Sequence, residues 1–231
     1  TDICGCFVAS IPTLPVYRGE LQGPCLGMAT AVFNPQGKLA GQNEKGELVC
    51  TIPFPSKPIG FWGDNQNEKY LSAYFEGFPG VWTHGDFASV SETGGFTLYG
   101  RSDATLNSKG VRIGTAEIYR VVETFPQIQE SMAVSQDWDN DTRVVLFVVV
   151  KEGQIFDDEV AKEVKRALRD QASPRHVPDK IIVAPELPRT KSNKLVELAV
   201  TDVINGREVR NRDALANPGA LDWFKDLADL K

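Results

Sequence analysis

The chain has 231 residues, a formal net charge of −6 and 42% hydrophobic residues. That length accommodates one or two domains with hydrophobic cores of their own. An acidic chain argues against non-specific binding to nucleic acid or to anionic membranes, because both need basic patches. No run of eighteen apolar residues occurs, so the sequence predicts no membrane span.

The cysteines and the start of the chain indicate its setting. All four cysteines lie in the first fifty residues, at Cys4, Cys6, Cys25 and Cys50, and the chain has only two histidines. Without a Cys-x-x-Cys pair we expect neither a zinc site nor a disulfide framework, and a reducing, cytosolic setting fits best. The chain starts at Thr1 with no charged and apolar leader, and we interpret it as a fragment that begins inside a motif.

Proline and glycine punctuate the first 102 residues, which predicts short strands and turns. One segment has apolar residues near helical spacing and is expected to be a helix, Glu68–Phe78. The strands are expected from Ala31 into a turn, and at Leu48–Ile52, Val81–Trp82, Phe87–Val90 and Phe96–Tyr99.

After Asp103 the pattern changes to longer helices and strands, which predicts an α+β fold. Thr115–Phe125 is expected to be a helix capped by Thr115, and Arg143–Val150, which is β-branched throughout much of its length, a central strand covered on both faces. Further strands are expected at Ser131–Gln136 and Lys180–Val183, further helices at Asp157–Ala172 and Lys194–Ile204, and a weakly helical tail over 205–231.

Five short motifs follow one another along the chain: Thr1–Asp2, Gly46–Leu48, Trp82–Asp86, Gly100–Ile118 and Pro188–Lys194. In this order they resemble the motifs of the adenylate-forming acyl-CoA synthetases, a family that also holds luciferases and peptide-synthetase adenylation domains. The resemblance covers nearly the whole chain, and five ordered matches are far more specific than one.

The resemblance implies a two-step ligation and a two-part organisation. A carboxylate attacks the α-phosphate of ATP, with Mg²⁺ and loss of pyrophosphate, and the thiol of CoA then displaces AMP from the acyl-adenylate. Residues 1–102 would be the β-rich C-terminal part of the large AMP-binding (adenylation) domain. Residues 103–231 would be the small, mobile α+β C-terminal domain. The partners implied are small-molecule substrates and a preceding portion of the same chain, with no nucleic acid.

By the same resemblance, Lys194 is expected to clamp the substrate carboxylate and the α-phosphate, for which a flexible point charge is suited. Asp86 is expected to accept hydrogen bonds from the ribose hydroxyls. The other expected nucleotide contacts are Arg101, Arg112 and Thr1, and Asp2 would be the acid linked to Mg²⁺. Taken singly, Lys194 and each arginine could equally be solvated surface residues, and Gly85–Asp86 an ordinary turn.

Three further assignments come from the resemblance. Asp103 occupies the hinge position, Gly110 leaves room for CoA beside the Lys109–Arg112 turn, and Arg169 would contact the CoA phosphate. The chain departs from the family pattern at two positions. Asp2 stands where Glu is usual, and Asn193 where Gly is usual, although Asn tolerates a left-handed backbone better than most residues.

Within the family, several segments resemble the branch that activates a short 3-oxo acid: Pro12–Glu20, Lys69–Phe75, Ser173–Pro178 and Asn211–Phe224. No residue pattern reveals an acyl pocket, because in this family the pocket lies mainly upstream. Two alternatives therefore stay open. The chain could come from an acetyl- or propionyl-CoA synthetase-like ligase, or be a non-catalytic interaction module of the same descent.

Overall fold

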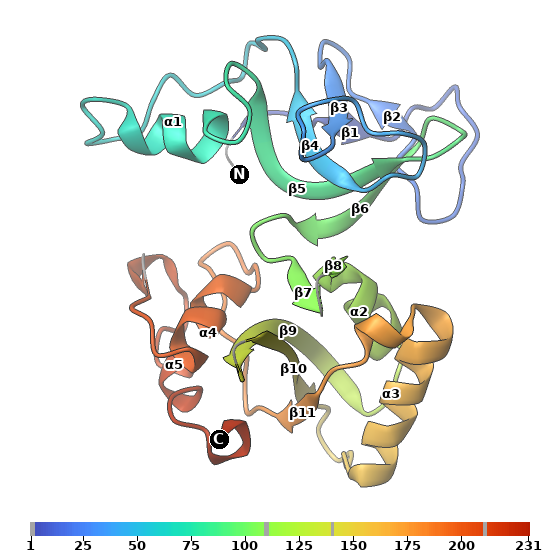
Figure 1. Ribbon diagram of the computed structural model, residues 1–231, viewed down its shortest axis with the longest axis vertical. Coiled ribbons are helices and arrows are strands. Elements are labelled where there is room, and N and C mark those ends of the chain that lie inside the picture. Colours follow the sequence, from blue (N-terminus) through green and yellow to red (C-terminus); the bar gives the residue numbers. More distant parts are fainter. Residues whose placement is uncertain (1–2, 109–110, 140, 210–211) are drawn as a thin grey trace. The chain divides into compact units, whose positions relative to one another are not determined.

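The computed structural model describes the chain except for residues 1–2, 109–110, 140 and 210–211. The chain divides into two compact units, Thr1–Ser102 and Asp103–Lys231. Helices and sheets occur together, so the predicted α+β class is confirmed (Figure 1). Among the described residues, no helix has both the length and the apolar character needed to cross a bilayer.

The first unit is built on a four-stranded antiparallel sheet in the order β3-β4-β5-β6. A two-stranded ribbon and one helix accompany it. Their bounds are β1 Val8–Ala9, β2 Gly23–Pro24, β3 Thr30–Phe33, β4 Gly46–Cys50, α1 Glu68–Phe75, β5 Trp82–Val90 and β6 Phe96–Arg101.

Helix α1 packs through aromatic rings. Tyr70 and Tyr74 are its buried residues, and the Tyr74 ring stacks on Trp82 with the centroids 3.8 Å apart. The helix ends at Phe75 rather than at Phe78 as predicted. Gly77 lies in the segment that follows, and glycine is a poor helix former because it loses the most backbone entropy.

The predicted split of Val81–Trp82 from Phe87–Val90 is wrong, because Trp82 and Phe87–Val90 belong to one continuous strand, β5, which begins at Trp82. The register shifts between Glu47 and Val49 on β4, and between Phe87 and Ala88 on β5. Such bulges let one strand carry an extra residue without ending. Gly85, which lies inside β5, therefore accompanies a bulge in this strand and does not end it.

The second unit contains a three-stranded sheet in the order β11-β10-β9, with β10 antiparallel to β9 and parallel to β11. A small hairpin, β7-β8, precedes it. The bounds are β7 Leu106–Ser108, β8 Val111–Ile113, α2 Thr115–Val122, β9 Ile128–Trp138, β10 Asp141–Val150, α3 Asp158–Gln171, β11 Lys180–Val183, α4 Glu197–Ile204 and α5 Ala220–Trp223, with short 3₁₀ turns at Pro174–His176, Arg212–Ala214 and Ala228–Leu230.

Helices cover both faces of this sheet (Figure 1). One core cluster joins it to α2 and α3, and the other joins it to α4, α5 and the tail. Strand β10 contributes to both clusters, with Leu146 and Phe147 each fully buried on opposite sides. The prediction that Arg143–Val150 is a central, doubly covered strand is confirmed.

Helix α2 begins at Thr115 as predicted, but it ends at Val122 rather than at Phe125, and its N-cap is Gly114 rather than Thr115. The Glu117 carboxylate accepts a hydrogen bond from the Gly114 amide at 3.0 Å and so caps the helix from its third residue. Helix α4 begins at Glu197 rather than at Lys194. The residues before it form a hairpin instead, in which Arg189 and Leu195 make an antiparallel bridge.

Candidate active site

In the first unit, Asp86 lies beside Arg101. The two residues are paired across β5 and β6, and Arg101 Nη1 lies 3.9 Å from Asp86 Oδ1. On the other side of the carboxylate, His84 Nε2 lies 3.6 Å from Oδ2. The Asp86 side chain is 26% exposed, so its oxygens face solvent as well as these neighbours. A part-exposed carboxylate next to a guanidinium can accept hydrogen bonds from a pair of hydroxyls.

The backbone conformation at position 85 favours glycine, and the Arg101 side chain lies close to it. The φ of Gly85 is +81°, a backbone region that side chains with a Cβ rarely adopt. A Cβ at Gly85 would also stand 2.5 Å from Arg101 Nη2 and 2.8 Å from Cζ. The Arg101 guanidinium therefore lies directly over the Gly85 backbone, and it donates through Nη1 to the His84 carbonyl at 3.1 Å.

Glu47 joins three parts of this site from the neighbouring strand β4. Its Oε1 accepts the Gly85 amide at 2.9 Å and the Ser102 hydroxyl at 3.0 Å. Burial raises the pKa of Glu47, while the hydrogen bonds from Ser102 and Gly85 and the charge of Arg101 lower it. This half-buried carboxylate thereby fixes the bulge that presents Asp86 and the end of β6 that presents Arg101.

In the second unit, Lys194 ends a tight hairpin loop and is exposed. The Thr190 amide donates to the Lys194 carbonyl at 2.9 Å, and the Lys194 amide donates to Thr190 Oγ1 at 3.1 Å. The Asn193 amide donates to the Thr190 carbonyl at 2.8 Å, and Asn193 has φ = 63°. A turn followed by one left-handed residue is a common three-residue hairpin connection. Asn193 thus supplies the left-handed residue that this turn needs.

The side chain of Arg189, the residue before the loop, holds the loop in place. Its Nη1 donates to the Asn193 carbonyl at 2.9 Å, and its Nη2 forms an ion pair with Glu130 on β9. One side chain therefore ties the loop to strand β9 and holds the backbone next to Lys194.

The remaining predicted residues lie on separate elements. Arg112 is exposed on β8 opposite Asn107, and Asp103 is the exposed first residue of the second unit. Arg169 lies in the last turn of α3. That helix covers one face of the sheet, whereas the Lys194 hairpin leads into α4 on the other face (Figure 1). The predicted residues Thr1, Asp2 and Gly110 lie outside the described residues.

Sequence reasoning missed three residues that organise the site. Glu47 and Arg189 each lie within one of the five motifs without an assigned role, and Asn217 lies in the tail. The signal for Arg189 was its place between Pro188 and Thr190. Nothing local pointed to Asn217, because its partners lie at Glu186, Leu187 and Arg189, up to 31 residues away.

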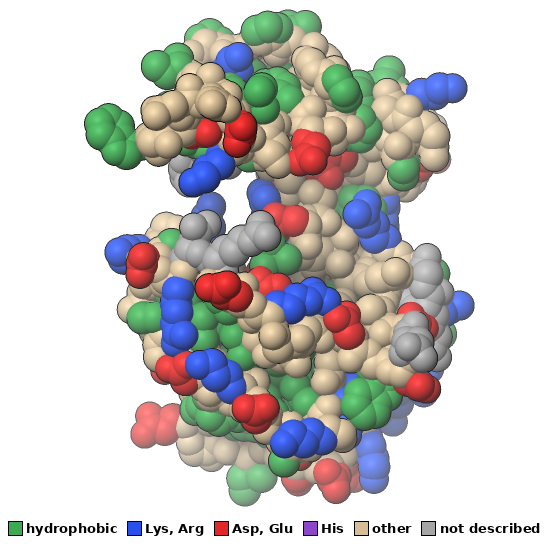
Figure 2. All heavy atoms as spheres, turned by 60° about the vertical axis from the view of Figure 1, so that its left-hand side comes forward, with side chains coloured by type: hydrophobic (Ala, Val, Ile, Leu, Met, Phe, Trp, Pro, Cys, Tyr) green, Lys and Arg blue, Asp and Glu red, His purple; other side chains and the backbone are tan. Residues whose placement is uncertain are grey.

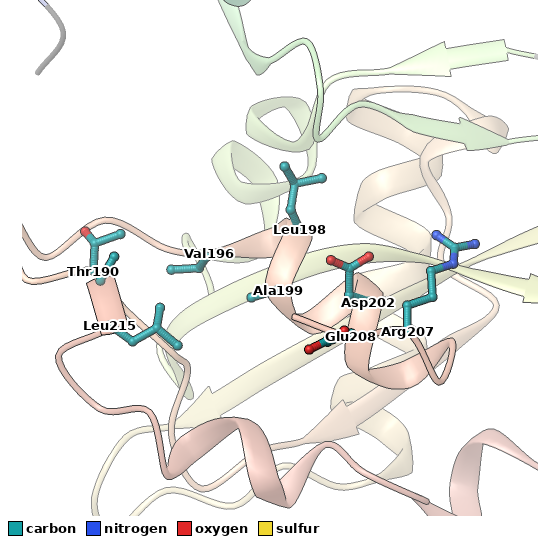
Figure 3. Close-up of a pocket in the computed structure, with 9 residues that line it drawn as sticks. Thr190, Val196, Leu198, Ala199, Asp202, Arg207, Glu208 and Leu215 are labelled. Atoms are coloured by element: carbon teal, nitrogen blue, oxygen red, sulfur yellow. The ribbon is translucent and has the colours of Figure 1, made fainter. Parts of the chain in front are cut away.

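A cavity of about 770 Å³ lies next to the hairpin, between α4 and the tail (Figure 3). Thr190, Val196 and Leu215 line one part of it, and Asp202 and Arg207 line another. Its described lining does not include Lys194, so we do not connect it with the chemistry expected of that residue. Among the described residues, no group of three or more His, Cys, Asp or Glu side chains could hold a metal ion.

Comparison with known proteins shows which class the second unit resembles. Residues 117–194 match the AMP-binding enzyme C-terminal domain. This match lies within the second unit, which is therefore similar to the C-terminal domain of AMP-binding enzymes.

The particular relatives are acetoacetyl-CoA synthetases. The chain is 54% identical over 231 residues to the acetoacetyl-coenzyme A synthetase of Rhizobium meliloti (strain 1021), covering 100% of this chain and 35% of that protein. It is 43% identical over 233 residues to the acetoacetyl-CoA synthetase of Gallus gallus, again covering 100% of this chain and 35% of the relative. The structure of acetoacetyl-CoA synthetase from Streptomyces lividans superimposes with a TM-score of 0.91 at 39% identity, over 99% of this chain and 35% of that one. The chain thus spans about a third of the length of the relatives that it matches.

Proposed function

We propose that this chain is the C-terminal third of an acetoacetate–CoA ligase. The observation that carries the proposal is the 54% identity to an acetoacetyl-coenzyme A synthetase over all 231 residues. The whole enzyme would convert acetoacetate, ATP and CoA to acetoacetyl-CoA, AMP and pyrophosphate in the cytosol. A preceding portion of the chain would supply the acyl pocket and most of the adenine site.

In the first half-reaction, a carboxylate oxygen of acetoacetate attacks the α-phosphorus of ATP, and the bond to pyrophosphate breaks. Two anions meet in this step, so a positioned cation lowers its barrier. Lys194 is the proposed clamp between the carboxylate and the α-phosphate. Its place at the end of an ordered hairpin supports this role, because the backbone is fixed while the ammonium stays exposed.

Asp86 and Arg101 are the proposed ribose contacts, and their adjacency across β5 and β6 supports the assignment. Thr1 would contact phosphate and Asp2 would be linked to Mg²⁺, which when bound neutralises phosphate charge.

In the second half-reaction, the thiolate of CoA attacks the acyl carbon of the adenylate and AMP leaves. We propose that residues 103–231 turn about Asp103 between the two steps, exchanging the Lys194 hairpin for the hairpin that carries Arg112. The boundary of the two compact units between Ser102 and Asp103 supports a hinge at that position. Gly110 and Arg169 are the proposed CoA contacts. Residues 1–102 would be the C-terminal part of the large AMP-binding domain, and residues 103–231 the mobile domain.

The test is acid-dependent exchange of pyrophosphate into ATP by the full-length enzyme, with acetoacetate, acetate, propionate and butyrate compared. A clear preference for acetoacetate supports the proposal. A preference for acetate retains the two-step chemistry and overturns the substrate, and no exchange with any of the four acids refutes the ligase function.

A further inference from the structure

The C-terminal tail runs alongside the strand that leads into the Lys194 hairpin. Thr190 and Leu215 form an antiparallel bridge, and Figure 3 shows their side chains close together at one end of the cavity. The Lys191 amide donates to the Ala214 carbonyl at 3.1 Å, and the Ala216 amide donates to the Arg189 carbonyl at 2.8 Å. The tail therefore acts as an added edge strand beside the hairpin.

Asn217 closes this contact with its side chain. Its Oδ1 accepts the Arg189 amide at 2.8 Å, and its Nδ2 donates to Glu186 Oε2 at 2.9 Å and to the Leu187 carbonyl at 3.1 Å. One amide thus satisfies three groups on four consecutive residues. Arg189, whose backbone Asn217 holds, in turn holds the Asn193 carbonyl at the other side of the loop.

The tail is itself anchored in the core. Leu215, Leu221 and Phe224 are buried, and the Phe224 ring meets Phe147 of β10 edge-on with the centroids 4.8 Å apart. Because the tail is packed into the core, its hydrogen bonds can restrict the position of the hairpin. A tail without such packing would move together with the hairpin and could not restrict it. The contact therefore runs from the core, through the tail, to Arg189 and the Lys194 loop.

We propose that Asn217 is a positioning residue for Lys194, and that the tail holds the Lys194 hairpin in the geometry needed for adenylation. The proposal rests on the proposed function, in which Lys194 acts in the first half-reaction. It follows that loss of Asn217 slows the step that uses Lys194 and spares the step that does not. Small displacements of a reacting group can reduce a rate by about a hundredfold.

Asn205 provides a matched control in the same unit. Its side chain also makes three hydrogen bonds, from the Asp137 amide at 2.7 Å and to the carbonyls of Ser135 and Thr201 at 3.1 and 2.8 Å. It caps the C-terminal end of α4, and these three hydrogen bonds go to β9 and α4 rather than to the hairpin strand. Asn217→Ala and Asn205→Ala therefore remove equal numbers of hydrogen bonds and differ in what those bonds hold.

The experiment measures both half-reactions in the full-length enzyme. We expect Asn217→Ala to reduce kcat for acetoacetate-dependent pyrophosphate exchange by about ten- to a hundredfold, with the rate of thioester formation from preformed acetoacetyl-adenylate and CoA unchanged. Asn205→Ala is expected to leave both rates near wild type. Equal loss in the two variants, or equal loss in the two half-reactions, would overturn the proposal. If the alanine variants do not fold, Asn217→Asp and Asn205→Asp, which keep the acceptor and lose the donors, are compared in the same way.

Amide hydrogen exchange separates this proposal from the proposed function. Asn217→Ala should accelerate exchange at Lys191 and Lys194, and Asn205→Ala at Asp137, whatever the enzyme activates. If the amides of Lys191 and Lys194 stayed equally protected in Asn217→Ala, the proposal that Asn217 holds the hairpin would be refuted. Absence of pyrophosphate exchange in the wild type would refute the ligase function instead.

Discussion

The two units of the chain bury their apolar residues to different degrees. In the second unit helices cover both faces of the sheet, and β10 is buried over Val144–Val149. In the first unit Leu26, Ile59 and Trp62 are fully exposed, with relative exposures of 102%, 99% and 105%. Figure 2 shows hydrophobic side chains scattered over the surface of the first unit and alternating charges over much of the second.

Among the described residues, ten large hydrophobic side chains are exposed in the first unit and five in the second, which is the longer of the two. Exposed apolar residues that are scattered singly are normal, whereas a contiguous apolar patch marks a contact surface. The first unit has one buried core cluster and the second has two. The larger number of exposed apolar residues on the first unit is compatible with the proposal that this unit completes a larger domain.

The largest expected effect comes from separating the units. We predict that residues 103–231 alone unfold cooperatively, because two of the three core clusters lie wholly within them. Residues 1–102 alone are expected to lack a cooperative transition and to bind a hydrophobic dye, which is the behaviour of a chain with incomplete packing. Thermal melts by circular dichroism and dye fluorescence measure both. If residues 1–102 alone unfolded cooperatively and bound no hydrophobic dye, the proposed difference between the two units would be refuted.

The adenylation step is expected to depend on the second unit, because that unit contains Lys194. Lys194→Ala should reduce kcat for adenylation by about a hundred- to a thousandfold, because the charge that joins the two anions is lost. Pyrophosphate release measures this effect, and the melting temperature should stay unchanged since the side chain is exposed. The control is Lys191→Ala in the same loop, which is expected to stay active. Near-normal pyrophosphate release by the Lys194 variant would refute the assignment.

The first unit is expected to contribute to the affinity for ATP more than to the rate of the chemical step. Asp86→Ala should raise KM for ATP by about ten- to a hundredfold, the usual worth of hydrogen bonds to a charged group, with a smaller change in kcat. Steady-state kinetics of the full-length enzyme test it against Glu92→Ala, an exposed acid in the turn of the same sheet. An unchanged KM for ATP would reject Asp86 as a ribose contact.

The hairpin turn provides a smaller test. Asn193 has φ = 63°, where a β-branched residue is strained by about 1–2 kcal/mol. Asn193→Val should lower the free energy of unfolding by that amount, while Asn193→Gly should stay within about 1 kcal/mol of the wild type. Urea unfolding of residues 103–231 measures both variants. Equal stability of the Val and Gly variants would show that the left-handed turn is not retained in solution.

The smallest effect concerns Glu47 and pH. Burial raises the pKa of Glu47 in the folded chain above the ordinary value of 4.5. An acid with a raised folded pKa favours folding when protonated, and that contribution is lost as pH rises through the folded value. Glu47→Gln keeps an oxygen acceptor for Gly85 and Ser102 without the charge. We expect it to match or slightly exceed the wild-type melting temperature at pH 7, with the difference vanishing below pH 4.5. If Glu47→Gln melted at a lower temperature than the wild type at pH 7, and this deficit were smaller at pH 4.5, the prediction would be contradicted.

Local sequence signals predicted much of the second unit. The apolar, β-branched segment at Arg143–Val150 became the central strand, and Asp157 caps α3 by accepting the amides of Glu159 and Val160. These features depend on residues close in sequence, so a local pattern contains them. The prediction failed at Lys194–Val196, where Thr190 and a bridge from Arg189 to Leu195 outweigh helical propensity.

The sequence by itself determined the fold class and the ordered motifs. Both rest on residue type and short-range spacing, which the chain carries before it folds. Only the tertiary structure decided that Glu47 holds the bulge below Asp86 and that Asn217 holds the strand before Lys194. Those contacts join residues 38 and 28 positions apart. Such pairs are chosen by how strands and tail pack together, and no local pattern specifies that packing.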